Sequence, residues 1–267
     1  MTSKISTDPF YRKIATRATV RELMTPRVMF LDCRPDEPAH AVFERMKERD
    51  IDQAPVNREG EISEYVLRVD LPQTKVPVDT FAKPVRPSNL MSSNSRITSA
   101  LPLIHRAQFF FVLHQDEIAG IITHADFDKR PVRVLLYLLF SELESSLQRL
   151  MRMYEATPAY WFDKLPPNAK KEVARWHKKR EAKGVKLDAL DCFSLIHLFT
   201  ALRSEERFHQ LIGDRLHDYE KLYDLRNRVS HSGLDIAASP EEIDDLIGAK
   251  SRLIMILDRV RRALTRG

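Results

Sequence analysis

The 267-residue sequence has only two cysteines, Cys33 and Cys192, and only seven glycines. Two thiols are too few for a disulfide framework or a cysteine-rich metal cluster, so we interpret both as buried thiols of a reducing cytoplasm and expect no metal. The scattered glycines provide neither a glycine-rich phosphate loop nor a Gly-x-Ser-x-Gly nucleophile turn. These absences exclude disulfide-stapled domains, P-loop nucleotidases and serine hydrolases of that type.

Long hydrophobic runs are also absent. No window approaches the roughly eighteen uninterrupted apolar residues of a membrane-spanning helix, and the start, Met1–Ile5, lacks the apolar stretch of a secretory signal. Neither sign of charge is in large excess, because the net charge is +5, of which residues 131–267 contribute +4. We therefore expect a cytoplasmic protein without a membrane partner. Its mild basicity is compatible with RNA and equally with an ordinary solvated surface.

The first half contains a weak internal repeat. Each copy has a Leu-Met dipeptide, a helical pattern, a short apolar strand and a second strand that ends in an aspartate. The first copy contains Leu23–Pro26, 38–49, 54–56 and Asp70, and the second contains Leu90–Ser93, 97–106, 109–113 and Asp126. Aligned on the Leu-Met dipeptides, the second copy is 11 residues shorter. The repeat predicts two β-α-β-β-α units packed side by side, at about 17–80 and 81–131, after a lead-in segment at 1–16.

The second half has a different hydrophobic pattern. Apolar residues recur at helical spacing from Val134 to Met151 and again from Ile243 to Val260. Further helical candidates lie near 168–183, 188–203 and 205–229, and Pro240 followed by two glutamates is a good helix start. The pattern predicts an all-α bundle of four to five helices at 132–267. The whole chain is therefore expected to be an α+β protein.

Three short motifs in the first half carry a family resemblance. They are Met24-Thr25-Pro26, Ala54-Pro55-Val56 and, above all, Gly120-Ile121-Ile122-Thr123-His124-Ala125-Asp126. Over about residues 17–130 the chain resembles a tandem pair of CBS domains, a regulatory module. The resemblance implies a cleft between the two repeats and an adenine nucleotide, AMP, ATP or a related adenosine-containing molecule, as the regulatory ligand.

The residue types of the last motif suit such a ligand. Asp126 can accept hydrogen bonds from both hydroxyls of a ribose, Thr123 can reach the ribose or the α-phosphate, and Gly120 permits close backbone approach. A helix that begins near Asp126 would suit a phosphate. The alternative is a capping box, in which Thr123 and Asp126 satisfy backbone N–H groups without any ligand. The first copy retains Asp70 but has Leu67 where the family has Ser or Thr, so at most one complete site is expected.

The second half contains the run Arg226-Asn227-Arg228-Val229-Ser230-His231, two residues before Gly233. This run resembles the Arg-Asn-x-x-x-His signature of HEPN domains, which are helical bundles. Many of them are metal-independent ribonucleases that act as dimers. The resemblance covers about residues 132–265. It implies that Arg226, Asn227 and His231 are catalytic and that RNA is a substrate.

These residue types fit the cleavage of RNA by its own 2′-hydroxyl. Histidine moves protons near neutral pH, and arginine holds a phosphate on which negative charge builds. Arg226 and His231 are about 140° apart around an ideal helix, so a helix end near Gly233 would let His231 turn inward, and a two-fold dimer would bring both pairs into one cleft. The alternative is that His231 is only a favourable donor near a helix C-terminus. Glu142 and Glu144 could pair with Arg226, but we interpret them as exposed helix residues.

Together, these patterns predict an adenine-nucleotide-sensing CBS pair that regulates a HEPN-like, metal-independent endoribonuclease acting as a homodimer. The main alternative is a non-enzymatic regulator whose helical half dimerises or binds a partner. A weaker alternative is nucleotidyl or phosphate-group chemistry on a protein partner, as a toxin–antitoxin component. Basic residues between Lys170 and Lys183 form a helical stretch that is compatible with RNA phosphates, although a solvated face is the more ordinary interpretation. Trp161 and Trp176 are expected to be core or interface anchors.

Overall fold

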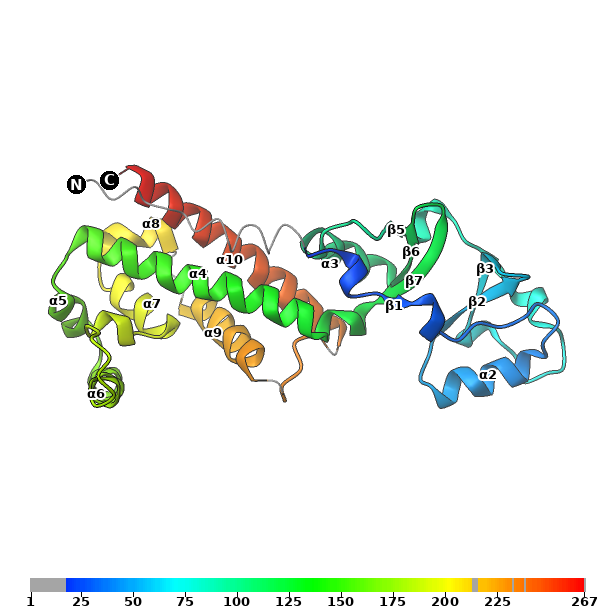
Figure 1. The fold of residues 1–267 in the computed structure, drawn as a ribbon, viewed down its shortest axis with the longest axis horizontal. Coiled ribbons are helices and arrows are strands. Elements are labelled where there is room, and N and C mark those ends of the chain that lie inside the picture. The colour runs from blue at the N-terminus through cyan, green and yellow to red at the C-terminus, as the bar shows by residue number, and fades with distance from the viewer. Residues whose placement is uncertain (1–17, 213–215, 232, 238, 267) are drawn as a thin grey trace. The chain divides into compact units, whose positions relative to one another are not determined.

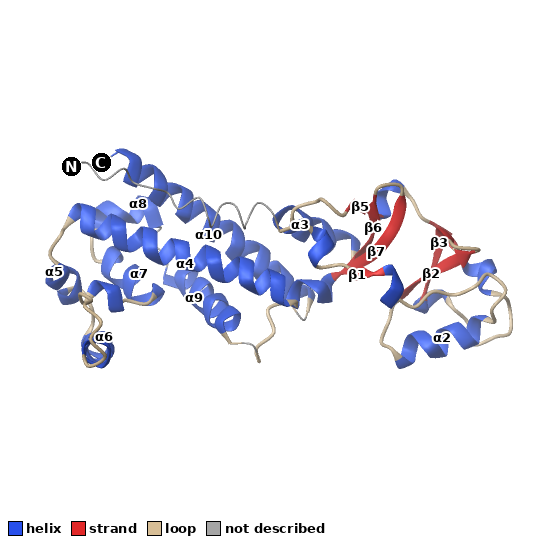
Figure 2. Ribbon diagram, viewed as in Figure 1, coloured by secondary structure: helices blue, strands red, loops and turns tan. Residues whose placement is uncertain are grey.

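The computed structural model describes residues 18–212, 216–231, 233–237 and 239–266, and the chain divides into two compact units (Figure 1). Residues 19–127 form a mixed unit of strands and helices, and the residues from Asp128 onward form a helical unit. Figure 2 places the described strands within the first unit. The predicted α+β class is therefore confirmed, while the expected lead-in segment at 1–16 lies outside the described residues.

The first unit contains two sheets, each built around one hairpin. One sheet has the strand order β2-β3-β4 and the other has the order β1-β7-β6-β5. The turn of the β2–β3 hairpin is Glu59-Gly60, with φ of 52° and 99°, the positive pair that a type I′ turn requires. The elements are β1 (Thr25–Pro26), α2 (Ala39–Glu48), β2 (Gln53–Arg58), β3 (Glu61–Leu67), β4 (Lys83–Pro84), β5 (Leu90–Ser92), α3 (Ile97–Ala107), β6 (Phe109–His114) and β7 (Glu117–Thr123).

The two repeats exchange short strands. β1 precedes the first repeat but pairs with β7 of the second, so that Pro26 lies opposite Gly120. β4 precedes the second repeat but pairs with β3 of the first, so that Pro84 lies opposite Glu64. Each antiparallel hairpin is thus extended by a strand from the segment that leads into the other repeat. This reciprocal exchange joins the two repeats into one compact unit.

The strand register corrects the expected alignment of the repeats. Cys33 forms a parallel bridge with Val56, and Met91 pairs in parallel with Val112. A β-bulge follows Val56 in one hairpin and Val112 in the other. Cys33 is therefore the counterpart of Met91, and the alignment on Met24 was wrong. In the correct register the distance to the motif aspartate is 37 residues in the first copy and 35 in the second, so the two copies are of nearly equal length.

The helix expected at the end of each repeat is replaced by short turns of 3-10 helix. In the first copy these turns span Arg68–Asp70 and Val78–Phe81. Pro72 and Pro77 lie between or beside them, and proline disrupts a helix interior because it lacks a backbone donor. In the second copy a 3-10 turn, His124–Asp128, leads directly into the first helix of the helical unit.

Aromatic side chains join the two repeats. The ring of Tyr65 on β3 meets Phe109 and Phe111 of β6 edge-on, with centroid distances of 5.4 and 5.7 Å. Such pairs add about 0.5–1.5 kcal/mol each beyond the burial of their area. The packing explains why the second repeat has a Phe-rich strand where the first has a Pro-Val step.

Gly120 is required by the crossing of β1 over β7. A Cβ atom at this position would lie 2.6 Å from the backbone oxygen of Thr25 and 2.8 Å from Sδ of Met24. The close approach that we expected at Gly120 is therefore made by the protein's own backbone. The glycine of the motif thus has a structural role that needs no ligand.

We expect Gly120→Ala to lower the free energy of unfolding by about 1–3 kcal/mol, because the added methyl group would force the β1 backbone away from β7. Gly248→Ala is the matched control. Gly248 lies in a long helix, and no atom lies within 4 Å of the place that a Cβ would occupy there, so alanine should stabilise that helix by about 0.5–1 kcal/mol. Calorimetric unfolding of both variants measures the two opposite signs. Equal, small effects would contradict the crossing-strand explanation.

The helical unit contains five described helices of nine residues or more and two shorter ones. They are α4 (Arg130–Tyr154), α5 (Pro158–Asp163), α6 (Pro167–Glu181), α7 (Leu195–Arg203), α8 (His209–Ile212), α9 (Leu216–Ser230) and α10 (Pro240–Arg266). α4 and α10 pack against one another along their lengths, and α9 contacts both (Figure 1). Trp161 is fully buried, as expected of a core anchor.

Candidate functional site

The motif at the end of β7 places Asp126 in a buried position. Asp126 is 4% exposed and lies in the 3-10 turn that follows the strand. Its Oδ2 accepts hydrogen bonds from the backbone N–H of Thr123 at 2.6 Å and from the Thr123 hydroxyl at 3.2 Å. Its Oδ1 accepts a long bond, 3.5 Å, from the hydroxyl of Thr25 on β1. This arrangement is that of the capping alternative, with β1 closing over it.

The counterpart in the first repeat has an ion pair at the same position. Asp70 Oδ2 lies 2.6 Å from Nζ of Lys83 on β4, and the Asp70 carboxylate raises the pKa of the Lys83 amine. Because Pro26 corresponds to Pro84, Lys83 is the counterpart of Thr25. Each motif aspartate is therefore contacted by the residue that the crossing strand brings from the other repeat. Sequence reasoning missed Lys83, because only the strand register identifies its partner.

A cavity of about 460 Å³ opens between the tips of the two hairpins of the first unit. Gly60 and Ile62 line it from the β2–β3 hairpin, and Asp116 and Ile118 line it from the β6–β7 hairpin. Arg27 lies at its edge and donates to the Gly60 carbonyl. Thr123 and Asp126 do not line this cavity. This cavity is thus distinct from the motif.

In the helical unit, Arg226 lies on α9 against α4. Its Nε is 3.4 Å from Oε1 of Glu144, an ion pair without hydrogen-bond geometry. Burial raises the pKa of the Glu144 carboxyl, and the charge of Arg226 opposes that shift. A small cavity of about 30 Å³ adjoins the pair, lined by Tyr137, Phe140, Ser141, Val229 and Ser230. A partly buried carboxylate therefore holds the arginine side chain in place.

The expectation that Glu142 and Glu144 are exposed was wrong. Glu142 is buried, with 4% of its side chain exposed, and its Oε1 lies 2.6 Å from the Arg261 guanidinium of α10. The side chain of Glu144 is 23% exposed and faces Arg226. Both carboxylates lie on the inner side of α4, where arginines of the neighbouring helices pair with them. The spacing of charged residues alone did not reveal these partners.

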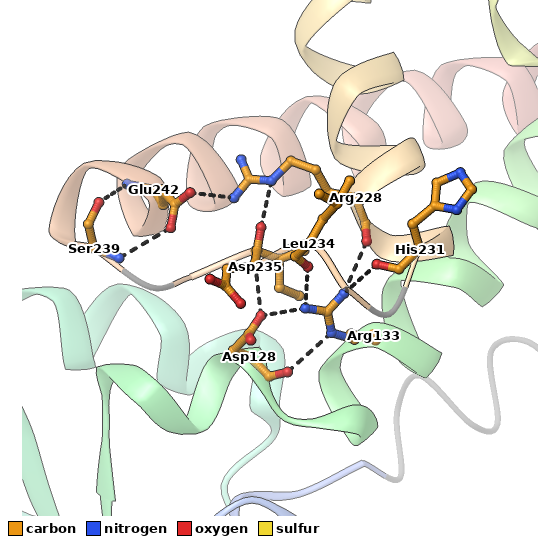
Figure 3. Close-up of polar contacts among 9 residues, drawn as sticks. Asp128, Arg133, Arg228, His231, Leu234, Asp235, Ser239 and Glu242 are labelled. Atoms are coloured by element: carbon orange, nitrogen blue, oxygen red, sulfur yellow. Dashed lines mark hydrogen bonds and ion pairs between the residues drawn. The ribbon is translucent and has the colours of Figure 1, made fainter.

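His231 directly follows the last residue of α9. Its backbone N–H donates to the Asn227 carbonyl at 3.0 Å, and its side chain is exposed. Figure 3 shows the imidazole directed away from the polar contacts that surround its backbone. Among the described residues, no hydrogen bond or ion pair joins the side chains of Arg226, Asn227 and His231. Within one chain, the predicted catalytic residues are neighbours on one helix end but do not converge.

Arg133, in the first turn of α4, organises the segment that carries His231 (Figure 3). Its guanidinium donates to the carbonyls of Arg228 at 3.0 Å, His231 at 3.4 Å and Leu234 at 2.5 Å. It also lies 2.8 Å from the Asp128 carboxylate. The last carbonyls of a helix have no partner within the helix, so this arginine caps α9 from outside. Sequence reasoning missed Arg133.

The far side of the same loop is held by Asp128 and Arg228. Asp128 Oδ1 accepts a hydrogen bond from the Ile236 backbone N–H at 2.8 Å. Arg228 donates to the Asp235 carbonyl at 2.7 Å and to Glu242 at 2.9 Å. Glu242 also belongs to the capping interactions that start α10 (Figure 3). The described part of the loop between α9 and α10 is therefore tied to α4 and α10 by charged groups.

The two cysteines differ in their surroundings. Cys33 is buried, as expected, and burial raises the pKa of its thiol to about 12, whereas Cys192 is only partly buried. Within the described ranges, no group of three histidine, cysteine, aspartate or glutamate residues is placed to hold a metal ion. In the same ranges, no helix has the length and apolar character needed to cross a membrane.

No family model matches the sequence, and no curated protein matches it. Solved structures resemble it over less than half of its length. The CBS domain of the bacterial CNNM/CorC family Mg²⁺ transporter in complex with ATP is 22% identical, with a TM-score of 0.37, over 44% of this chain and 89% of that one. CBSX2 in complex with AMP is 17% identical, with a TM-score of 0.37, over 45% and 97%. A CBS domain-containing protein of unknown function from Bacillus anthracis is 12% identical, with a TM-score of 0.39, over 43% and 93%.

Proposed function

We propose that residues 19–127 are a CBS-type pair that binds an adenine nucleotide and regulates the helical unit, which is a metal-independent endoribonuclease acting as a homodimer. The observation that carries the sensor is the reciprocal strand exchange, which brings Thr25 onto Asp126 and Lys83 onto Asp70. The two aspartates lie at equivalent positions, and each is contacted by a residue on the strand that crosses from the other repeat. The fold therefore has two related sites, and a ligand bound at either would change how the repeats pack.

The second repeat is the better nucleotide site. The Thr25–Asp126 hydrogen bond is long at 3.5 Å, so a ribose hydroxyl could take the place of Thr25 at a small energetic cost. In the first repeat, Lys83 neutralises Asp70 at 2.6 Å and Leu67 offers no hydroxyl. A ribose there would have to break a charged pair. We therefore assign the ribose to Asp126, with Thr123 beside it and Gly120 beneath β1.

The ribonuclease proposal rests on the exposed imidazole of His231 and on the held guanidinium of Arg226. Glu144 orients Arg226, which would stabilise the charge on the phosphate, and His231 would move the proton of the ribose 2′-hydroxyl. Asn227, one turn before His231, would orient the phosphate. Since the side chains do not converge within one chain, a second copy would supply the facing half of the cleft.

A short path through one backbone turn and two polar contacts leads from Asp126 to His231. Asp126 and Asp128 lie in the same 3-10 turn, His124–Asp128. Asp128 binds Arg133, and Arg133 donates to the carbonyl of His231. A nucleotide that alters the turn at Asp126 would therefore act on the segment that holds His231. Such control requires that the ligand bind two states of the turn with different affinity.

We expect Asp126→Ala to weaken AMP or ATP binding by at least tenfold in titration calorimetry, because two hydrogen bonds to a carboxylate are lost, each worth about 1.5–3 kcal/mol. Asp126→Asn is the second variant, since its amide oxygen retains the cap to Thr123 while the charge is removed. Glu48→Ala, at the end of α2, removes an exposed carboxylate of the same unit as the control. Unchanged nucleotide affinity in both Asp126 variants would remove this residue from the site.

The regulated activity is tested by incubating the intact protein with single-stranded RNA, with and without AMP and ATP. Cleavage that leaves 2′,3′-cyclic phosphate ends and changes with nucleotide supports the whole proposal. The second candidate function, a non-enzymatic regulator, is favoured by the ion pair that engages Arg226 with Glu144. Nucleotide binding without cleavage under any of these conditions would establish that alternative.

A further inference from the structure

Helix α6 concentrates the positive charge of the protein. Its fifteen residues include six lysines and arginines and two glutamates, a net charge of +4 in a chain whose net charge is +5. Only Val173 of this helix is buried. The helix is therefore a largely exposed, basic element held to the unit by a narrow apolar contact.

Three cations on one side of this helix have no side-chain partner within the part of the chain that the structure describes. The side chains of Lys171, Arg175 and Lys178 take part in no hydrogen bond or ion pair there, and all three residues are exposed. By the 3.6-residue repeat they lie within about 60° of one another, on the side opposite Val173. The two glutamates of the helix lie near histidines instead of near these cations. A carboxylate oxygen of Glu172 is 3.6 Å from the imidazole of His197, and one of Glu181 is 3.7 Å from that of His177.

The helix dipole does not account for this arrangement. Cations in the last turn are favoured by the negative end of a helix, which explains Lys178 to Arg180. Lys171 and Arg175 lie earlier and are four residues apart, a spacing at which like charges destabilise a helix by a few tenths of a kcal/mol. Some other cations of the unit do have carboxylate partners, as Lys164 has in Glu205 and Arg152 has in Asp188. The uncompensated charge indicates an anionic partner.

An exposed aromatic ring borders the basic face. Trp176 is 42% exposed, and Nζ of Lys179 lies 5.0 Å from its ring centroid. A ring of this kind beside a row of cations fits single-stranded nucleic acid, whose bases stack on aromatic side chains while its phosphates bind lysine and arginine. A lipid surface fits less well, because α6 has no apolar face free to insert.

We infer that the α6 basic face, formed by Lys171, Arg175, Lys178, Lys179 and Trp176, is the surface that captures single-stranded RNA. The choice of RNA as the ligand rests on the proposed ribonuclease function, whereas the charge and exposure of α6 were observed independently of it. The phosphates bind the three unpaired cations and a base stacks on Trp176. The surface thus supplies binding, separate from the residues assigned to cleavage.

The test measures binding by fluorescence anisotropy with a labelled single-stranded RNA of about 16 nucleotides, in a His231→Ala background that does not consume the probe. Lys171→Gln/Arg175→Gln/Lys178→Gln is expected to weaken binding at least tenfold and to reduce the slope of log affinity against log salt by about 2, because each phosphate contact contributes about 0.7 for single strands. Trp176→Leu is expected to weaken binding about tenfold with the salt slope unchanged.

The matched control is Lys47→Gln/Arg49→Gln/Lys75→Gln, which removes the same charges from exposed positions of the first unit. It should bind RNA within about twofold of the parent protein. Equal weakening by the two triple variants would overturn the inference, since only net charge would then matter. The inference would also be overturned if the α6 substitutions weakened the binding of a polyglutamate peptide but left the binding of RNA unchanged. A different result would separate the two proposals. If His231→Ala abolished RNA cleavage but the α6 variants bound RNA normally, the RNA-binding surface would be refuted and the ribonuclease proposal would be retained.

Discussion

We expect His231→Ala to lower the rate of RNA cleavage at least hundredfold while changing the free energy of unfolding by less than about 0.5 kcal/mol. General acid–base catalysis by a positioned histidine contributes about 10²–10⁴-fold. The imidazole is exposed and has no partner among the described residues, and surface substitutions of this kind have small effects on stability. Initial rates of RNA cleavage and chemical unfolding curves measure the two quantities. A large loss of rate with intact stability is the signature of a reacting group.

The control for this experiment is His40→Ala. His40 lies in the first unit, on α2, and its ring forms a hydrogen bond with the Thr74 carbonyl. Its removal should leave the rate of RNA cleavage unchanged. Equal cleavage by the parent protein and by His231→Ala would exclude His231 as the proton-transfer group. A mixture of His231→Ala and Arg226→Ala proteins adds a test of the dimer, because a shared cleft would allow partial recovery of activity.

The elements of this fold could be predicted because their signals are local. Apolar spacing from Val134 to Met151 predicted most of α4, and the proline and acids at 240–242 marked the start of α10. In each repeat of the first half the helix and the two strands after it were also predicted correctly, whereas the closing helix was not. These features depend on neighbours within a few residues, which is what a single sequence records.

The register of the repeats could not be predicted in the same way. A Leu-Met dipeptide is too short to fix an alignment in a chain rich in apolar residues, and it matched Met24 to Met91. The hydrogen-bonded partners assign Cys33 to Met91 instead. Register is set by cross-strand pairing over long sequence separations, so the partners Lys83–Asp70 and Thr25–Asp126 became visible only in the fold.

The residues of the candidate site also fall into two groups, those that a local motif predicted and those that only the fold revealed. Arg226, Asn227 and His231 were identified because they form one short run. Glu144 and Arg133 lie about 80 to 100 residues earlier, and their roles come from helix packing. Arg133 in particular binds backbone carbonyls, and a carbonyl is present at every residue, so no sequence pattern marks it as the acceptor.

We expect Arg133→Ala to lower the free energy of unfolding of the helical unit by about 2–4 kcal/mol. The substitution leaves the carbonyls of Arg228, His231 and Leu234 without their donor and leaves Asp128 without its counter-charge. Hydrogen bonds to a charged group are worth about 1.5–3 kcal/mol each. The side chain is 13% exposed, so water can replace only part of this network. Urea unfolding followed by circular dichroism measures the loss.

Arg130→Ala is the matched control, because Arg130 lies in the same first turn of α4, is exposed and has no partner among the described residues. It should change stability by less than about 0.5 kcal/mol. If the Arg133 network also fixes His231, then Arg133→Ala should slow RNA cleavage at temperatures where the protein remains folded, and Arg133→Lys should recover little, since a single ammonium cannot reach several acceptors in fork geometry. Full cleavage by folded Arg133→Ala would show that the α9 cap stabilises the unit without positioning His231. The path from Asp126 to the reacting group would then have to run elsewhere.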